Sequence, residues 1–155
     1  MSKTWKFITS VIGVEVIGSI GIIFTGPNIN TWYTTLNKAS FNPPNWLFGP
    51  IWTFLFFLMG WAFYLIWTNA TKNKSGAYWA FGFQFLLNIL WSVIFFGAKE
   101  PGFAFIEIII MWFAILWTII KFYKINKTSA YLLMPYLIWV TIASILNYYV
   151  WILNM

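Results

Sequence analysis

The residue types that usually perform acid–base, nucleophilic or metal chemistry are nearly absent from this sequence. Its 155 residues include no histidine, no cysteine and only three acids, and arginine is missing as well. The chain therefore has no zinc site, no thiolate nucleophile, no serine–histidine–aspartate triad and no histidine or cysteine ligand for haem iron. We expect no bound metal and no cofactor, so any chemistry must use aromatic rings, amides or the few acids.

Aromatic side chains are abundant, making up 24% of the chain, with 12 Trp and 17 Phe. This is more than the two interfacial belts of a membrane protein require, so some of these rings should line an interior surface. Gln84, Asn88 and Trp91 lie at i, i+4 and i+7, which places two amides and an indole on one helix face. An amide that faces lipid is unsatisfied. We therefore expect this face to look inward, either as a ligand site or as a hydrogen-bonding contact between helices.

A second candidate surface lies near the C-terminus, where Trp139, Ala143, Leu146 and Val150 share one helix face. The small Ala143 between larger neighbours leaves a notch. Such a notch can seat a flat ligand or simply a neighbouring helix, which is the more frequent use of a small residue in membranes.

Two of the acids, Glu15 and Glu107, lie within apolar runs. Acids inside a membrane are by default candidates for function. Glu107 is only about five residues into its run, where reaching back to the interface would suffice. No titratable side chain follows either acid at helical spacing, so we do not expect a proton relay.

The elements that must position these residues are five apolar stretches, at 7–24, 46–67, 78–96, 103–122 and 131–153. Each is close to the roughly 20 residues that cross a bilayer as a helix. Only 8% of the residues are charged, against about 25% in soluble domains. We predict an all-α membrane protein, with residues 1–155 forming one compact bundle of five transmembrane helices, the first of them retained rather than cleaved as a signal peptide.

The connection at 25–45 is about twice as long as the others and contains Trp32, Tyr33 and Phe41. Long ordered loops in compact domains are usually functional. We expect it to form a lid that caps a ligand pocket, with an aromatic anchor at the membrane interface as the alternative. Pro43 and Pro44 should fix the entry into the second helix.

The nine lysines outnumber the three acids. In the five-span arrangement seven lysines lie on the N-terminal side and two, Lys38 and Lys99, on the other. The excess of positive charge predicts a cytoplasmic N-terminus, with the first loop and the C-terminus outside. Membrane orientation explains the charge better than a nucleic-acid partner, which we do not expect.

Three segments carry a resemblance to a known family: Trp32 and Tyr33 followed by KASFNPPNWLFGPIWTFLFFLMGWA (38–62), then LLNILWSVIFF (86–96), then PYLIWVTIASILNYYVWILN (135–154). Together they resemble the translocator protein family, also called tryptophan-rich sensory proteins or peripheral benzodiazepine receptors. The match covers almost the whole chain in order. Ala39 stands where the family usually has proline, and Phe56 where tyrosine is common.

The resemblance implies a bacterial cell-membrane protein that binds a porphyrin, such as protoporphyrin IX or haem, and drugs of the benzodiazepine-receptor type, in tetrapyrrole sensing or handling. It places the pocket among the helices. We expect Lys38, near the mouth of the pocket, to meet the propionates. Together with the two helix faces described above, it gives as ligand-binding residues Tyr33, Pro43, Trp52, Phe56, Gln84, Asn88, Trp91, Trp139, Ala143 and Leu146.

Other functions stay open. One is an enzyme that degrades porphyrin with light and oxygen, for which Trp52 and Trp139 would be the oxidisable catalytic neighbours, since no acid–base pair supports ordinary turnover. A transporter of tetrapyrroles or sterols is another, although five helices without an inverted repeat lack the usual architecture. The least specific alternative is a purely structural membrane protein.

A homodimer is a further expectation. Gly13, Ile17 and Gly21 form a thin strip of the first helix that is available for packing, either inside the bundle or against a second subunit.

Overall fold

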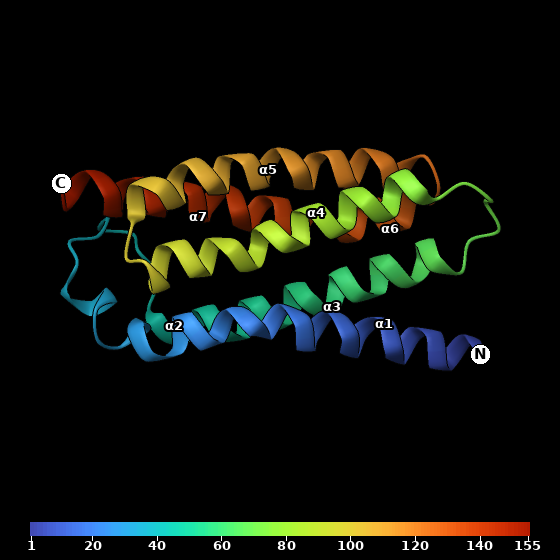
Figure 1. The fold of residues 1–155 in the computed structure, drawn as a ribbon, viewed down its shortest axis with the longest axis horizontal. Coiled ribbons are helices and arrows are strands. Elements are labelled where there is room, and N and C mark those ends of the chain that lie inside the picture. Colours follow the sequence, from blue (N-terminus) through green and yellow to red (C-terminus); the bar gives the residue numbers. More distant parts are fainter.

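The computed structural model describes residues 1–155 and consists of helices joined by loops, with no strand (Figure 1). Five helical segments are long and apolar enough to cross a membrane, which confirms the predicted all-α bundle. Their bounds are Lys3–Ile29, Asn45–Trp67, Ser75–Gly97, Pro101–Tyr123 and Lys127–Leu153. Each segment begins one to four residues before the predicted apolar run, because the helices continue into the flanking residues.

Several of these segments contain short turns of other helix types. The first consists of α1 (Lys3–Gly18), the 3-10 turn η1 (Ser19–Gly21) and α2 (Ile22–Ile29). The second consists of the 3-10 turn η3 (Asn45–Leu47) and α3 (Phe48–Trp67). The third consists of α4 (Ser75–Ser92) and the π-helical turn η4 (Val93–Gly97). The fourth is α5 (Pro101–Tyr123), and the fifth consists of α6 (Lys127–Leu132) and α7 (Met134–Leu153).

The boundary predicted for the first loop was wrong at its start. Residues 25–29, expected as loop because of Gly26 and Pro27, belong to α2, and the connection is 30–44 with the 3-10 turn η2 (Tyr33–Thr35) inside it. Backbone groups at membrane depth must be satisfied within the chain, which favours continued helix over an open turn. A proline is tolerated there because only one amide donor is lost.

Consecutive spans run antiparallel, and the termini lie at opposite ends of the bundle (Figure 1). α1 packs along α3 so closely that a Cβ atom added to Gly60 would lie 2.6 Å from the Val11 Cα. α5 packs between α4 and α7. This leaves α2 and the start of α3 at one end of the bundle, together with the first loop and the C-terminus.

The first loop is tied to the end of α7 by reciprocal hydrogen bonds. The Asn37 backbone N–H donates to Asn154 Oδ1 at 3.0 Å, and Asn154 Nδ2 donates to the Asn37 carbonyl at 2.8 Å. Lys38 Nζ closes the loop on itself by donating to the carbonyls of Tyr33 and Leu36, at 2.8 and 2.9 Å. The loop is therefore held in one place over this end of the bundle.

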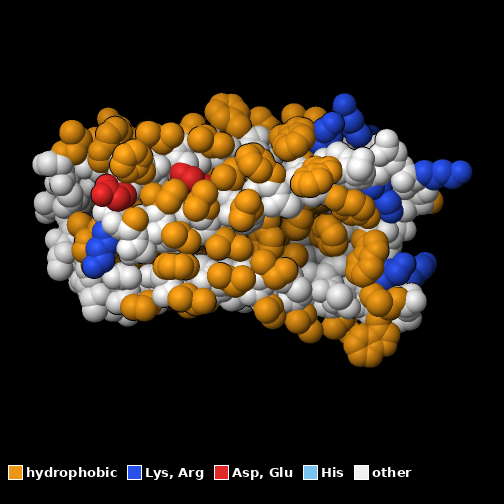
Figure 2. All heavy atoms as spheres, viewed as in Figure 1, with side chains coloured by type: hydrophobic (Ala, Val, Ile, Leu, Met, Phe, Trp, Pro, Cys, Tyr) orange, Lys and Arg blue, Asp and Glu red, His pale blue; other side chains and the backbone are white.

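The outer surface is apolar along most of its length, and the lysines gather at the end that carries the N-terminus (Figure 2). Such a surface fits a protein embedded in a bilayer. The lysines thus gather at the end for which the sequence predicts a cytoplasmic location. The orientation in the membrane itself stays a prediction.

The sequence predicts that the Glu107 side chain reaches back to the membrane interface. In the structure it does not, and this prediction was wrong. The side chain is only 6% exposed, and neither carboxyl oxygen has a hydrogen-bond partner within the chain. The reason is its position on the face of α5 that carries Ile108 and Met111, which also pack inside the bundle. Glu15, by contrast, is only half-buried.

Candidate ligand pocket

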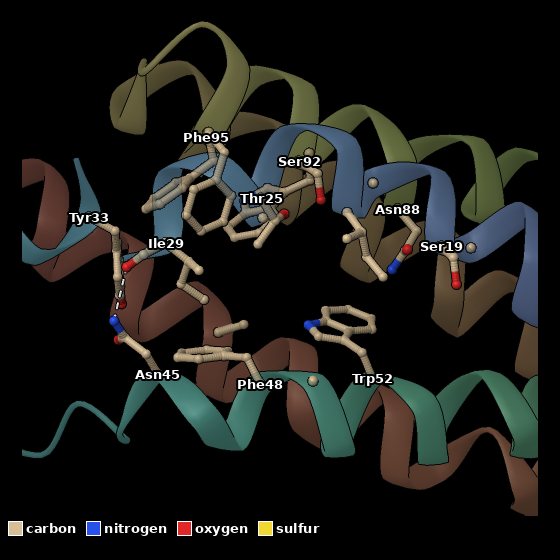
Figure 3. Close-up of a pocket in the computed structure, with 18 of the residues that line it drawn as sticks. Ser19, Thr25, Ile29, Tyr33, Asn45, Phe48, Trp52, Asn88, Ser92 and Phe95 are labelled. Carbon is tan, nitrogen blue, oxygen red and sulfur yellow. Dashed lines mark hydrogen bonds between the residues drawn. The ribbon is translucent and has the colours of Figure 1, made fainter. Parts of the chain in front are cut away.

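A cavity of about 400 Å³ lies among α1, α2, α3, α4 and α7, in the half of the bundle nearest the first loop. Two bulky side chains of α3, Phe48 and Trp52, form one wall (Figure 3). The opposite wall comes from η1, α2 and α4 and carries Ser19, Thr25 and Ser92. The cavity is large enough for a small organic ligand, for which pockets of about 300–1,000 Å³ are typical.

Aromatic rings form much of the lining. Trp139 of α7 meets Phe48 with ring centroids 5.9 Å apart, and Trp91 of α4 stacks on Phe95 at 4.8 Å. Trp52 lies 5.5 Å from Phe56, one helical turn further along α3. Rings at such distances present flat apolar surfaces from three helices, which suits a planar ligand.

Phe56 closes the cavity at its deep end. Its ring packs against Gly18, where an added Cβ would lie 2.7 Å from the ring, and against Phe85 at a centroid distance of 6.2 Å. The missing side chain at Gly18 is what lets the ring reach this position. The end of the cavity therefore depends on one glycine of α1.

Two amides fix the α4 and α7 walls. Asn88 Nδ2 donates to the Tyr136 hydroxyl at 3.0 Å. Trp91 Nε1 donates to Asn147 Oδ1 at 2.9 Å, and Asn147 Nδ2 donates to the Pro101 carbonyl at 2.8 Å. The indole N–H of Trp139 is fully buried and has no hydrogen-bond partner within the chain.

The first loop contributes Tyr33 to the lining. Its ring is 4% exposed and packs against Phe48 and Phe96, and its hydroxyl donates to Asn42 Oδ1 at 3.0 Å. Burial raises the pKa of the Tyr33 phenol, and the bond to Asn42 opposes that rise. Asn45 Nδ2 donates to the Ile29 carbonyl at 2.9 Å and joins the two ends of the loop (Figure 3).

The cavity opens on the side of the bundle, between α2 and the start of α3. Ile22, Trp46 and Thr53 all line it and are themselves exposed on the outer surface. Because this surface is apolar, the opening faces the region that a bilayer would occupy.

Eight of the ten predicted site residues line this one cavity. They are Tyr33, Trp52, Phe56, Asn88, Trp91, Trp139, Ala143 and Leu146. Gln84 and Pro43 do not. Gln84 is 1% exposed with no partner for its amide, and it lies one turn beyond Asn88, where Phe56 already ends the cavity. Pro43 lies in the loop outside the lining.

The role expected for Lys38 does not fit its position. Its ammonium group is engaged by two loop carbonyls and lies 4.8 Å from the Tyr33 ring, and burial lowers the pKa of this amine. It is not part of the lining, in which no charged residue occurs. A propionate inside the cavity would find no lysine there.

Sequence reasoning missed the contribution of the first span. Gly18, Ser19, Gly21, Thr25 and Gly26 all line the cavity. Their small size was the available signal. Only Gly21 was singled out, as part of a packing strip, and that was correct in part, since an added Cβ would lie 3.0 Å from Ser92 Oγ.

Comparison with known proteins places this geometry in context. The TspO/MBR family matches residues 10–152. The chain is 42% identical to the tryptophan-rich protein TspO of Archaeoglobus fulgidus over 96% of its own length and 97% of that protein's. It is 37% identical to the human translocator protein over 77% of its own length and 73% of that protein's. It is 36% identical to a tryptophan-rich sensory protein of Cereibacter sphaeroides over 76% and 73% of the two lengths. The helical bundle, its membrane spans and these matches together establish that the chain is an integral membrane protein of the TspO/MBR family.

Proposed function

We propose that this protein is a membrane receptor for porphyrins such as protoporphyrin IX, and for flat drugs of the benzodiazepine-receptor type, in tetrapyrrole sensing or handling. The observation that carries the proposal is the cavity itself, whose aromatic lining from α3, α4 and α7 is joined by Tyr33 of the loop. Offset or edge-on contact with each ring contributes about 0.5–1.5 kcal/mol beyond burial.

Metal-free porphyrin fits the site better than haem ligated by the protein. The chain has no histidine or cysteine to bind iron, and the lining offers indole N–H, amide and hydroxyl groups instead.

Titration of the purified protein with protoporphyrin IX in the dark tests the proposal, with quenching of tryptophan fluorescence as the readout. We expect saturable quenching that a flat receptor drug reverses. Quenching that rises linearly with porphyrin, with no saturation and no competition, would mean that the porphyrin only dissolves in the detergent or lipid.

The second candidate function is photo-oxidative degradation of the bound porphyrin by oxygen. It is favoured by the presence of Trp52 and Trp139, both easily oxidised, in the lining of one cavity. Trp52→Phe and Trp139→Phe keep a flat wall and remove an indole. If this function is real, loss of the porphyrin absorption under fixed illumination should slow much more than binding weakens.

A second copy of the chain is a proposed partner. The first span, Lys3–Ile29, is the least covered of the five, with 22% of its most apolar stretch buried. Gly13 in this span has no atom within 4 Å of an added Cβ. A close helix contact at this position would cover the exposed face. Cross-linking of a Gly13→Cys variant in membranes tests it, with Ile145→Cys on the exposed part of α7 as a control.

A further inference from the structure

The Ser and Thr hydroxyls of the membrane spans differ in whether they are hydrogen-bonded within the chain. Within membrane helices, Ser and Thr normally donate to the carbonyl one turn earlier. Five side chains in the spans, and Thr68 just after α3, do so at distances of 2.7–3.1 Å: Ser10, Thr53, Thr68, Thr118, Thr141 and Ser144. Ser19, Thr25 and Ser92 make no such bond and have no other hydrogen-bond partner within the chain, and all three line the cavity. The other unbonded hydroxyls of the spans belong to Thr4, Thr9 and Thr128, which are exposed on the outer surface and do not line the cavity.

These hydroxyls come together on one wall. Figure 3 shows Ser19, Thr25 and Ser92 on the side of the cavity that faces Phe48 and Trp52. They arise from η1, α2 and the end of α4. Gly21 makes the convergence sterically feasible, because its bare Cα lets η1 approach Ser92 closely.

Asn88 adds an acceptor to the same wall. Its Nδ2 is committed to Tyr136, whereas its Oδ1 makes no bond within the chain. It is labelled on the same side of the cavity in Figure 3. The wall therefore offers hydroxyls, which can donate or accept, beside an amide oxygen that can only accept.

The chemistry of this wall selects the group that it can bind. Polar groups inside an apolar cavity cost free energy until they are bonded. Because the lining has no charged residue, an ionised group would lack a counter-ion there. The wall is satisfied best by an uncharged group that has an acceptor and a donor side by side.

We propose that Ser19, Thr25, Ser92 and Asn88 Oδ1 form a hydrogen-bonding subsite for a neutral carboxylic acid or primary amide on the edge of a flat ligand. The hydroxyls donate to its carbonyl oxygen, and Asn88 accepts from its O–H or N–H. The subsite rests on the proposed function, and it specifies which polar edge the ligand must carry opposite Trp52.

The test combines three porphyrins with matched variants. Protoporphyrin IX has carboxyl groups, its dimethyl ester has lost the donors, and etioporphyrin has alkyl groups only. Thr25→Val removes an unbonded hydroxyl at nearly constant shape. Thr53→Val makes the same change at a lining residue whose hydroxyl is already bonded to the Gly49 carbonyl at 3.1 Å.

Dissociation constants are measured in the dark by tryptophan quenching in lipid nanodiscs. Thr25→Val and Ser92→Ala should each weaken protoporphyrin IX about fivefold, the value of one hydrogen bond, and leave etioporphyrin unchanged. Thr25→Ser, which keeps the hydroxyl, should bind like the unmodified protein. Thr53→Val should alter no ligand selectively.

Failure of the subsite and failure of the proposed function give different results. If the unmodified protein binds none of the three porphyrins saturably, the proposed function fails. If it binds them but Thr25→Val and Thr53→Val have the same effect, or if Thr25→Val weakens etioporphyrin equally, the hydroxyl subsite is refuted while porphyrin binding stands.

Discussion

Replacement of Gly18 by alanine should push the Phe56 ring into the cavity. The added Cβ would lie 2.7 Å from the ring, whereas carbon atoms in contact are normally about 3.5–4.0 Å apart. The ring must therefore move by about 1 Å to restore contact distance. Phe85 of the core lies behind it, so the free space is on the side of Trp52 and the cavity.

The magnitude follows from overpacking. Inserting a methyl group into a packed site costs about 1–3 kcal/mol. The higher helix propensity of alanine offsets less than about 1 kcal/mol of this cost, because Gly18 is the last residue of α1 and not in its interior. Since the displaced ring occupies ligand space, we expect affinity for protoporphyrin IX to fall about tenfold, equivalent to about 1.4 kcal/mol.

Gly13→Ala is the matched control, because it lies on the same helix with no atom within 4 Å of the added Cβ. Affinity is measured by tryptophan quenching in the dark, and stability by thermal unfolding in one detergent. The double variant Gly18→Ala with Phe56→Leu should recover part of the lost affinity. If Gly18→Ala binds as tightly as Gly13→Ala, the assignment of Phe56 as the end of the ligand site is wrong.

Three further predictions concern topology, the loop and photochemistry. Cysteines placed at the exposed positions Ser40 and Lys72 should label from opposite sides of the membrane, with Lys72 on the cytoplasmic side, and labelling from one side would contradict the five-span orientation. Asn154→Ala removes the hydrogen bonds between the Asn154 side chain and Asn37 and should raise hydrogen exchange across residues 30–44, measured by mass spectrometry, whereas unchanged exchange would mean that the other contacts of the loop are enough to hold it. Trp52→Phe and Trp139→Phe should weaken dark binding about fivefold, the scale of one aromatic contact, and an unchanged rate of light-driven porphyrin loss at saturating ligand would reject the enzymatic alternative.

The spans could be predicted from the sequence because the bilayer imposes a simple requirement. A helix of about 20 apolar residues satisfies its own backbone in hydrocarbon, so apolar runs mark spans directly. The end of the first span was mispredicted for the same reason: Gly26 and Pro27 are turn formers in water, but membrane depth keeps them helical.

The site was predicted in part because helical spacing places side chains on one face. That reasoning correctly predicted that Asn88 and Trp91 line the cavity, but it also included Gln84. Gln84 lies on the same face of α4, one turn beyond Asn88 and past the end of the cavity. The depth is set by Phe56 packing on Gly18, a contact between helices that local periodicity does not contain. Ser19 and Thr25 were missed because which hydroxyls remain unbonded is decided by tertiary packing.

The central claim is that the cavity beside Ala143 is where porphyrin binds. Its most direct test is the dark equilibrium titration of Ala143→Phe with protoporphyrin IX, beside Ala98→Phe, which places the same ring on the exposed connection before α5. We predict saturable binding in the unmodified protein and in Ala98→Phe, and a loss of at least tenfold in affinity in Ala143→Phe, since the new ring occupies the notch. Equal affinity in all three proteins would contradict the assignment of this cavity as the porphyrin site.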